Sequence, residues 1–487
     1  MTVKKINYGL AQAMIQSHPS DSSIIRNGIM LIILVSYAMI VLDTSIIITG
    51  LPKIHADLGF SDAGLSWVSN AYTLTFGGFL LLGARAGDIL GRRRMLVGGL
   101  TIFAISSLLI GLAQTPDWLI AARAVQGLGS AILAPSTLAL LQTNFPAGPE
   151  RTRAISFYAS AAGVSASIGL VLGGILAEWL SWRVGFFINL PIGIGLILAA
   201  RRHIRETPRR SGTFDFAGAL TSTLGMSALV FSIVNSTSAG WSDPLTIKML
   251  AGGVVLLGGF VLIEWRAKRP IMPLRLFASR ERSGAYAARM LFIGANMGFF
   301  FFSTQLMQGV LGYSPALAGL AFMPAMIVNF MAALGAPRLI GLVGGRNVLV
   351  GSMLLGLIGM AWLAQASSGT TYLGGLALPM LLIGVGQGGA LGPLTASGIA
   401  NIAVEDAGAA SGLVNAAHQL GSSLGLSVQI AAAVVGSGTL TGVGLLSHRV
   451  ENAMATAAAM IVLALVIAFR TVPGARSGGA LTSFGRR

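Results

Sequence analysis

Long apolar runs recur along the whole chain, and they limit its fold more than any other feature. Each run is long enough for a helix that crosses about 30 Å of hydrocarbon. Because apolar residues follow one another without alternation, the runs predict helices rather than the strands of a membrane barrel. Only 10% of the 487 residues are charged, whereas a soluble domain carries about 25%. We therefore predict an all-α polytopic membrane protein with spans at 29–51, 66–86, 95–114, 118–142, 154–178, 184–200, 214–236, 247–265, 284–309, 316–337, 347–366, 372–400, 409–437 and 452–470.

The basic residues predict how these fourteen spans are oriented. Most of the 32 lysines and arginines lie in alternate connections, which predicts that both chain ends are inside the cell. The net charge of +16 belongs to these short connections, so it favours a membrane surface over nucleic acid. The first run is too long for the apolar part of a cleaved signal, and we expect it to stay as the first spanning helix.

Two basic stretches that contain prolines, 201–212 and 265–283, divide the chain, and only two predicted spans lie between them. A six-helix half before them and another after them is a known transporter arrangement. We expect a cytoplasmic tail at 1–27, a six-helix bundle at 28–200, a cytoplasmic linker at 201–213, a two-helix insert at 214–265, a second linker at 266–283, a second six-helix bundle at 284–470 and a cytoplasmic tail at 471–487.

A short basic loop, GARAGDILGRRR at 83–94, separates the second and third predicted spans. Its glycines predict a sharp turn and its arginines predict an inner location. Asp88 is expected to pair with an arginine or to face a helix N-terminus. An ordinary inner loop is the plainer interpretation, and a latch between two halves of a transporter is the sharper one. The stretch 335–346 echoes this loop at the same place in the second half, as an internal repeat would.

Several motifs, in this order and spacing, resemble the major facilitator superfamily. They are LDTSIIITGLP at 42–52, the loop at 83–94, RAVQGLG at 123–129 and WRVGFFINLPIG at 182–193. The resemblance covers about 28–470 and is to the fourteen-helix drug:proton antiporters of the EmrB and QacA kind. It implies a major facilitator fold with two six-helix bundles around a central path, and a conformational-switch role for the loop at 83–94. The residues that match that role are Gly83, Asp88, Gly91, Arg92 and Arg93.

The antiporter-like motif of the fifth helix departs from the family pattern. Gly163, Gly169, Gly173 and Gly174 keep the glycines that allow close helix packing, but Leu170 stands where the family has proline. Ser45, Ile48 and Ile89 are further departures. The missing proline leaves open a symporter, or a dedicated exporter of a single small metabolite.

Proton coupling needs a titratable group inside the membrane. Asp43 is the only acid deep inside a predicted span, and such residues mark function by default. A purely structural carboxylate paired with Arg123 is the alternative. Arg123 and His418 complete the proposed proton-coupling set, while Arg289 is expected to extend its side chain to the inner surface.

The substrate path should carry polar and aromatic side chains from both halves. A face of aromatic rings suits a lipophilic cation. The candidates are Tyr72, Asn296, Phe299, Phe302, Gln305 and Gln308, with Asn329, Trp362, Gln387 and Gln429 as further possibilities.

Other function classes find no support. The chain has no P-loop for ATP and no cysteine, and its five histidines show no metal-ligand spacing. We expect no enzyme activity, no cofactor and no metal. The predicted partners are a small lipophilic substrate, protons and membrane lipids, with no nucleic acid. We expect a monomer in the bacterial inner membrane, with a periplasmic adaptor left open. The sequence thus predicts a proton-coupled multidrug exporter. A single-metabolite transporter and a non-transporting membrane sensor or assembly subunit are the alternatives.

Overall fold

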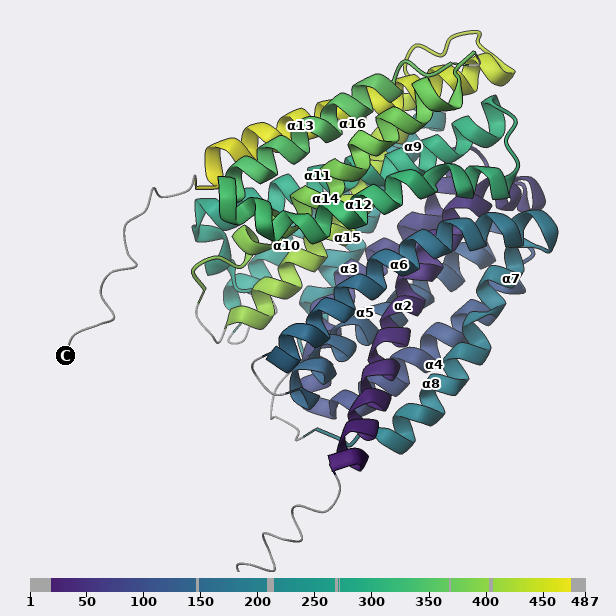
Figure 1. The fold of residues 1–487 in the computed structure, drawn as a ribbon. Helices are drawn as coiled ribbons and strands as arrows, with labels where there is room; N and C mark the ends of the chain where they lie inside the picture. The colour runs from purple at the N-terminus through teal and green to yellow at the C-terminus, as the bar shows by residue number, and fades with distance from the viewer. Residues whose placement is uncertain are drawn as a thin grey trace, which may run out of the picture.

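Every regular element of the described residues is a helix (Figure 1). The computed structural model describes residues 19–145, 149–207, 214–267, 270, 272–367, 369–402 and 406–473. Much of the predicted tails, at 1–18 and 474–487, and of the first linker, at 208–213, lies outside them.

The N-terminal half is built from helices that follow the predicted spans closely. In this half α3 and α4 pack on α5, α2 packs on α6, and α8 packs on α4. Thr115 and the proline after it begin α5, because the Thr115 hydroxyl accepts a hydrogen bond from the Trp118 N–H. The bounds are α2 Pro19–Leu58, α3 Trp67–Leu90, α4 Arg92–Gly111, α5 Pro116–Asn144, α6 Pro149–Trp179, α7 Trp182–Phe187 and α8 Asn189–His203.

The insert and the C-terminal half continue the same pattern. The insert is a hairpin of α9 and α10, which pack on each other. In the C-terminal half α11 packs on α15 and α16, and α14 packs on α12 and α13. The bounds are α9 Phe216–Ala239, α10 Pro244–Arg266, α11 Arg280–Gln305 with a π turn at Leu306–Val310, α12 Pro315–Val343, α13 Gly345–Leu363, a π turn at Tyr372–Ala377 leading into α14 Leu378–Gly398, α15 Ala407–Ala433 and α16 Gly442–Thr471.

Thirteen helical stretches among the described residues are long and apolar enough to cross a membrane. The expected span at 409–437 corresponds to α15, which is not one of the thirteen. It carries Asn415, His418 and Gln419 and packs between α3 and α11. The full count of fourteen spans and the inward orientation of both ends stay predictions.

The predicted loop at 83–94 is almost entirely helical, which corrects the expected turn. α3 runs to Leu90 and α4 begins at Arg92, so Gly91 alone breaks the helix, with φ 106°. Gly83, the first glycine of the stretch, serves packing instead. A Cβ on Gly83 would lie 2.1 Å from the Ala131 carbonyl oxygen of α5. Gly344, with φ 86°, makes the corresponding break between α12 and α13, as the sequence echo predicts.

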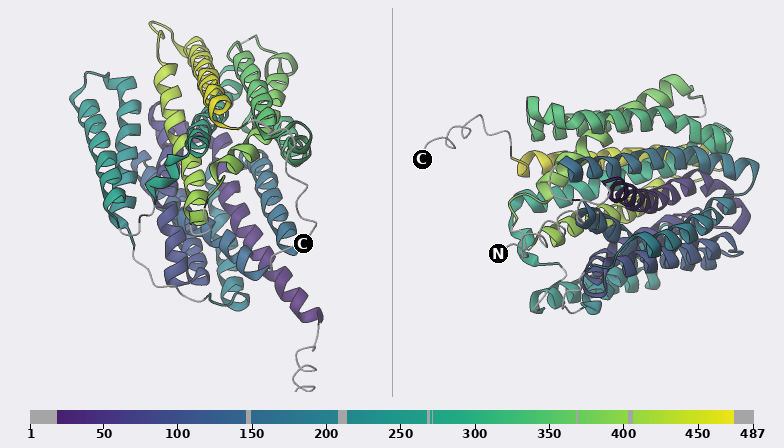
Figure 2. Two further views of the ribbon diagram at one scale, coloured as in Figure 1. Left: turned by 90° about the vertical axis from the view of Figure 1, so that its left-hand side faces the viewer. Right: turned by 60° about the horizontal axis from the view of Figure 1, so that its bottom comes forward.

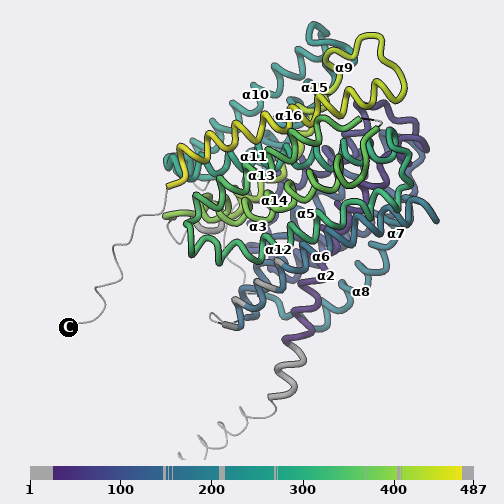
Figure 3. Tube along the Cα trace, turned by 45° about the horizontal axis from the view of Figure 1, so that its top comes forward, coloured from purple at the N-terminus to yellow at the C-terminus, as the bar shows by residue number. Residues whose placement is uncertain are grey.

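The two halves meet mainly along two helix pairs, α6 with α12 and α3 with α15, with smaller contacts of α2 with α11 and α12. The insert helix α9 contacts both α3 and α15, and the teal hairpin lies at the edge of the bundle (Figure 2). Figure 3 shows α15 and α16 side by side at the C-terminal end of the chain. The α6–α12 and α3–α15 seams are therefore the surfaces at which the halves would have to move.

Candidate functional site

Asp43 lies in the middle of α2 and is enclosed by donors from two other helices. Its Oδ2 accepts a hydrogen bond from Arg123 Nη1 of α5 at 2.8 Å. Its Oδ1 accepts from Gln126 Nε2 at 2.9 Å and from Asn189 Nδ2 at 2.7 Å. The exposed fractions of the Arg123 and Asp43 side chains are 1% and 0%. We call these four residues the Asp43 cluster.

The Arg123 guanidinium is held on its other sides as well. Its Nε donates to the Val68 carbonyl at 2.9 Å. Its Cζ lies 4.3 Å from the centre of the Tyr72 ring, and the Tyr72 hydroxyl is 2.8 Å from Ser130 Oγ. Tyr72, expected on the substrate path, is 1% exposed and here supports Arg123. The charge of Arg123 is thus balanced by an acid, a carbonyl and an aromatic face.

Local sequence explains how these side chains converge. Arg123 and Gln126 are three residues apart on α5 and share one face. Asn189 begins α8 directly after α7 ends at Phe187, and this break brings the amide to Asp43. The pairing of Asp43 with Arg123 was an alternative raised by the sequence. Gln126 and Asn189 received no role, although both lie in motif stretches and are polar within apolar runs.

With an enclosed ion pair of this kind, the protonation state of the carboxylate can determine which arrangement of the surrounding helices is favoured. Such a pair is tolerated in an apolar interior only when hydrogen bonds complete it. Protonation of Asp43 would leave the Arg123 charge without its counter-ion, which favours a different arrangement of α2, α5 and α8. Neither of the two cavities described below is lined by a member of the Asp43 cluster.

His418 belongs to a separate cluster in the C-terminal half. Its Nδ1 is 3.3 Å from Arg289 Nη2, and Arg289 Nη1 donates to Thr395 Oγ1 at 2.9 Å. Arg289 is 7% exposed, so the expected extension to the inner surface is wrong. Thr395 of α14 and His418 of α15 give the Arg289 guanidinium the hydrogen-bond partners that water would provide at the surface. The Asp43 cluster and the His418 cluster therefore lie in different halves of the described structure.

The predicted substrate residues do not converge on one described cavity. Phe299 and Phe302 are buried in the apolar core, at 0% and 3% exposure. Gln305 is half-buried in the last turn of α11. Gln308 donates to the Thr49 carbonyl of α2 at 2.9 Å and so bridges the two halves.

Asn296 belongs to a chain of amides that reaches a cavity. Gln387 Nε2 donates to Asn296 Oδ1 at 2.6 Å, and Asn329 Nδ2 donates to Gln387 Oε1 at 2.9 Å. Asn329 and Gln387 line a cavity of about 190 Å³ between α12 and α14. This polar chain is the part of the predicted substrate path that lies beside open space.

The Gly91 break is closed by residues of its own half. Asp88 pairs with Arg92 across it. Glu206, just after α8, accepts hydrogen bonds from the Arg93 and Arg94 N–H groups at 3.0 and 3.1 Å. A Cβ on Gly91 would lie 2.5 Å from the Glu206 carboxyl. Glu206 was not identified from the sequence, because its partner helix is more than a hundred residues away.

The glycines of the fifth-helix motif divide between two neighbours. Cβ atoms on Gly169 and Gly173 would lie 2.9 and 2.3 Å from the Leu42 and Ile46 carbonyl oxygens of α2. A Cβ on Gly174 would lie 2.2 Å from the Pro315 carbonyl oxygen of α12, and one on Gly163 would lie 3.1 Å from the Phe330 ring. α6 thus joins the helix that carries Asp43 to the opposite half.

Similar proteins are known over most of the chain. It is 39% identical over 437 residues to the cephamycin export protein CmcT of Amycolatopsis lactamdurans, covering 88% of this chain and 90% of that protein. It is 38% identical to a puromycin resistance protein of Streptomyces alboniger, covering 82% and 80%. It is 32% identical to the multidrug resistance protein Stp of Mycobacterium tuberculosis, covering 80% and 72%.

The fold has solved counterparts as well. A bacterial homologue of the human lysosomal transporter Spinster, solved in an inward-facing and unoccupied conformation, matches with a TM-score of 0.65 at 16% identity. The match covers 93% of this chain and 98% of that one. The family model described as Major Facilitator Superfamily matches residues 33–426. The chain is therefore a multi-pass membrane protein that belongs to the Major Facilitator Superfamily, a family of transporters rather than enzymes.

Proposed function

We propose that the protein is a proton-coupled exporter that removes lipophilic, cationic compounds across the bacterial inner membrane by alternating access. Export is supported by the names of its relatives, among them an antibiotic export protein and a multidrug resistance protein. Proton coupling is supported by one observation above all, the fully enclosed Asp43–Arg123 ion pair.

The proposed cycle begins with protonation of Asp43 from outside. Loss of its charge frees Arg123, and the pull of the uncompensated guanidinium toward other acceptors loosens α2 from α5 and α8. Because α2 packs on α6 and α6 packs on α12, this change reaches the seam between the halves. Rocking of the halves would expose the proton site inside and the compound outside. His418, in the other half, is the second proposed proton site.

Asn296, Gln305 and Gln308 are the proposed polar contacts of the compound. All three lie on α11 or its π turn, which faces both its own half and α2. Phe299 and Phe302 would reach the compound only after the core repacks, since both are buried in this conformation.

The test uses the full chain in liposomes with an imposed pH gradient and a fluorescent lipophilic cation. We expect gradient-dependent transport by the native protein and its loss in Asp43→Asn, with cation binding retained. Asp117→Asn is the matched control, because Asp117 is exposed in the first turn of α5. The double variant Asp43→Asn/Arg123→Gln removes both charges, so it separates lost coupling from the misfolding that an unpaired buried arginine causes.

Gradient-driven transport that survives in Asp43→Asn would contradict coupling through Asp43. A second candidate function is export of a single metabolite, which is favoured by the relative named for cephamycin export. Competition assays distinguish the two functions. Chemically unrelated compounds inhibit one another in a broad exporter and fail to do so in a dedicated one.

A further inference from the structure

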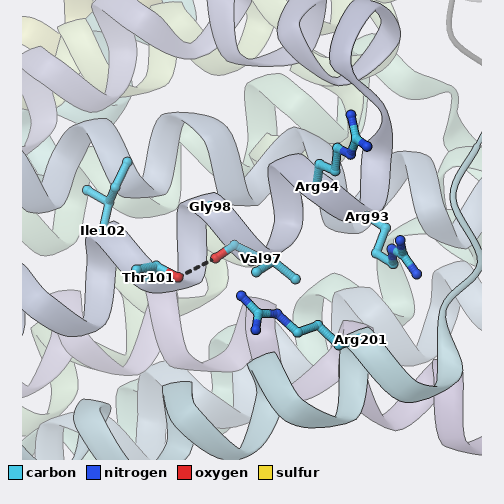
Figure 4. A pocket seen from close by; sticks show the side chains of 7 residues that line it. All are labelled: Arg93, Arg94, Val97, Gly98, Thr101, Ile102 and Arg201. Carbon is cyan, nitrogen blue, oxygen red and sulfur yellow. Dashed lines mark hydrogen bonds between the residues drawn. The ribbon is translucent and has the colours of Figure 1, made fainter.

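Three arginines line a groove on the surface of the N-terminal half, where Arg201 extends along α4 and Arg93 and Arg94 point away from it (Figure 4). The groove lies between the start of α4 and the end of α8 and encloses about 660 Å³. Its two helices, α4 and α8, are not among the helices of the α6–α12 and α3–α15 seams. Its lining residues are Arg93, Arg94, Val97, Gly98, Thr101, Ile102 and Arg201.

The groove carries more positive than negative charge. Arg201 has no hydrogen-bond or ion-pair partner among the described residues, and its side chain extends from α8 toward α4 in Figure 4. Glu206 Oε2 lies 3.8 Å from Arg93 Nε and 3.9 Å from Arg94 Nε. The Glu206 oxygens, however, already accept hydrogen bonds from two backbone N–H groups of α4. Glu206 thus offsets part of the charge of Arg93 and Arg94 and none of the charge of Arg201, so the groove keeps a net attraction for an anion.

The floor of the same groove is apolar and open. A Cβ on Gly98 would meet no atom within 4 Å. The Thr101 hydroxyl is used by the Val97 carbonyl, to which it donates at 2.8 Å. Farther along the same two helices, Ile105 and Leu198 are 52% and 62% exposed. The groove thus continues from a basic end onto a surface suited to hydrocarbon.

We propose that this groove binds an anionic phospholipid of the adjoining leaflet. Arg201 holds the phosphate, Arg93 and Arg94 add positive charge at the same end of the groove, and one acyl chain lies over Gly98 and Ile102. Basic groups at the membrane surface next to apolar helix faces are the chemistry that recognises such lipids. Free phosphate would use the arginines but would gain nothing from the apolar floor. The proposal is independent of proton coupling and of the exported compound.

The experiment measures lipid retained by the purified full-length protein in native mass spectrometry, with phosphatidylglycerol and phosphatidylcholine titrated separately. We expect phosphatidylglycerol to be retained preferentially. Arg201→Gln should weaken that binding about fivefold, the effect of one arginine near an anionic headgroup. Arg202→Gln is the matched control, because it removes the same charge from the adjacent, exposed position outside the groove.

A second pair of variants tests the acyl chain. Gly98→Leu fills the open floor and should weaken phosphatidylglycerol binding with all three arginines in place. Gly195→Leu is its control, since a Cβ on Gly195 of α8 also meets no atom within 4 Å and Gly195 does not line the groove. Unchanged unfolding temperatures verify that all four variants fold.

Two results would overturn the proposal. Equal retention of both lipids, insensitive to Arg201→Gln, would show that no headgroup is recognised. Binding that Arg201→Gln weakens but Gly98→Leu leaves unchanged, and that inorganic phosphate displaces, would assign the arginines to free phosphate instead.

Discussion

At the scale of single residues, the Asp43 cluster is a complete hydrogen-bonded unit with one exception. Both Asp43 oxygens are occupied, but the buried Asn189 Oδ1 has no hydrogen-bond partner in the described structure. An unsatisfied buried acceptor costs about 1–3 kcal/mol. The contribution of Asn189 to the cluster is therefore its Nδ2, which donates to Asp43.

Removal of this amide should destabilise the N-terminal half. We predict that Asn189→Leu lowers the unfolding free energy by about 1–3 kcal/mol, because Asp43 Oδ1 loses one of its two donors. Unfolding temperatures in detergent, followed by tryptophan fluorescence, measure the effect. Asn415→Leu is the control, since Asn415 is exposed and donates only to its own helix. Equal loss in both variants would contradict the role given to Asn189.

The pair of Arg275 and Asp406 outside the membrane predicts a pH dependence. Arg275 donates to both Asp406 oxygens, at 2.9 and 2.7 Å, and these hydrogen bonds hold the pKa of Asp406 below 3.8. A carboxyl whose pKa is lowered in the folded state adds stability above its unfolded pKa and loses it as the pH falls through the folded pKa.

The matching variant is Arg275→Gln. We expect the native protein to unfold at a higher temperature than this variant at about pH 6, and the difference to shrink as the pH falls below 3.8 and Asp406 takes up its proton. Added salt should reduce the difference at the higher pH. A difference that persists at low pH would mean that Arg275 acts through packing rather than charge.

At the scale of helices, glycine decides how closely α6 approaches its neighbours. Gly169 and Gly173 bring it against α2, and Gly174 brings it against α12. The Leu170 carbonyl lies in the same contact, where it accepts a hydrogen bond from Thr49 Oγ1 at 3.2 Å. α6 therefore connects α2, which carries Asp43, to α12 of the C-terminal half.

Gly174→Ala tests that link. The added methyl group would meet the backbone of α12, which cannot rotate away, so we expect a loss of about 1–3 kcal/mol in stability and a marked fall in transport rate. Gly252→Ala in α10 is the control, because its Cβ meets no atom within 4 Å. Transport and unfolding temperature are measured on the same preparations. Native behaviour of Gly174→Ala would show that the α6–α12 seam is not tightly packed during turnover.

Helix positions followed from the sequence because continuous apolarity gives only one stable form in lipid. The expected span at 154–178 and α6 at Pro149–Trp179 differ only at the ends. The expected turn at 83–94 was wrong, because the sequence alone does not distinguish a glycine that bends the chain from one that allows close helix packing. Gly83 is of the second kind. Asp43 stood out as an isolated intramembrane acid. Gln126, Asn189 and Glu206 could not be assigned, because their partners are set by tertiary packing.

At the scale of the whole molecule, the halves are joined at the end that carries Asp62 and Arg449, the predicted outer end. Arg449 at the start of α16 pairs with Asp62 between α2 and α3. Gln308 adds its hydrogen bond to Thr49 near the same end. These polar contacts close the described conformation on that side.

Weakening this closure should open the same end more often. Arg449→Gln should speed the labelling of a cysteine introduced by Gln308→Cys up to about fivefold, the range for an exposed ion pair. The chain contains no other cysteine, so the label reports one site. Arg183→Gln is the control, because Arg183 pairs with Asp57 inside the N-terminal half. Faster labelling with that control would point to general loosening.

The complete enclosure of Asp43 has a consequence for time as well as for energy. A carboxyl group that water cannot reach exchanges its proton only during the moments when the helices around it separate. After a sudden change in pH, the lag before Asp43 changes its protonation state is therefore set by how often the bundle opens. The rate of that protonation would then measure the opening rate of the helices around Asp43.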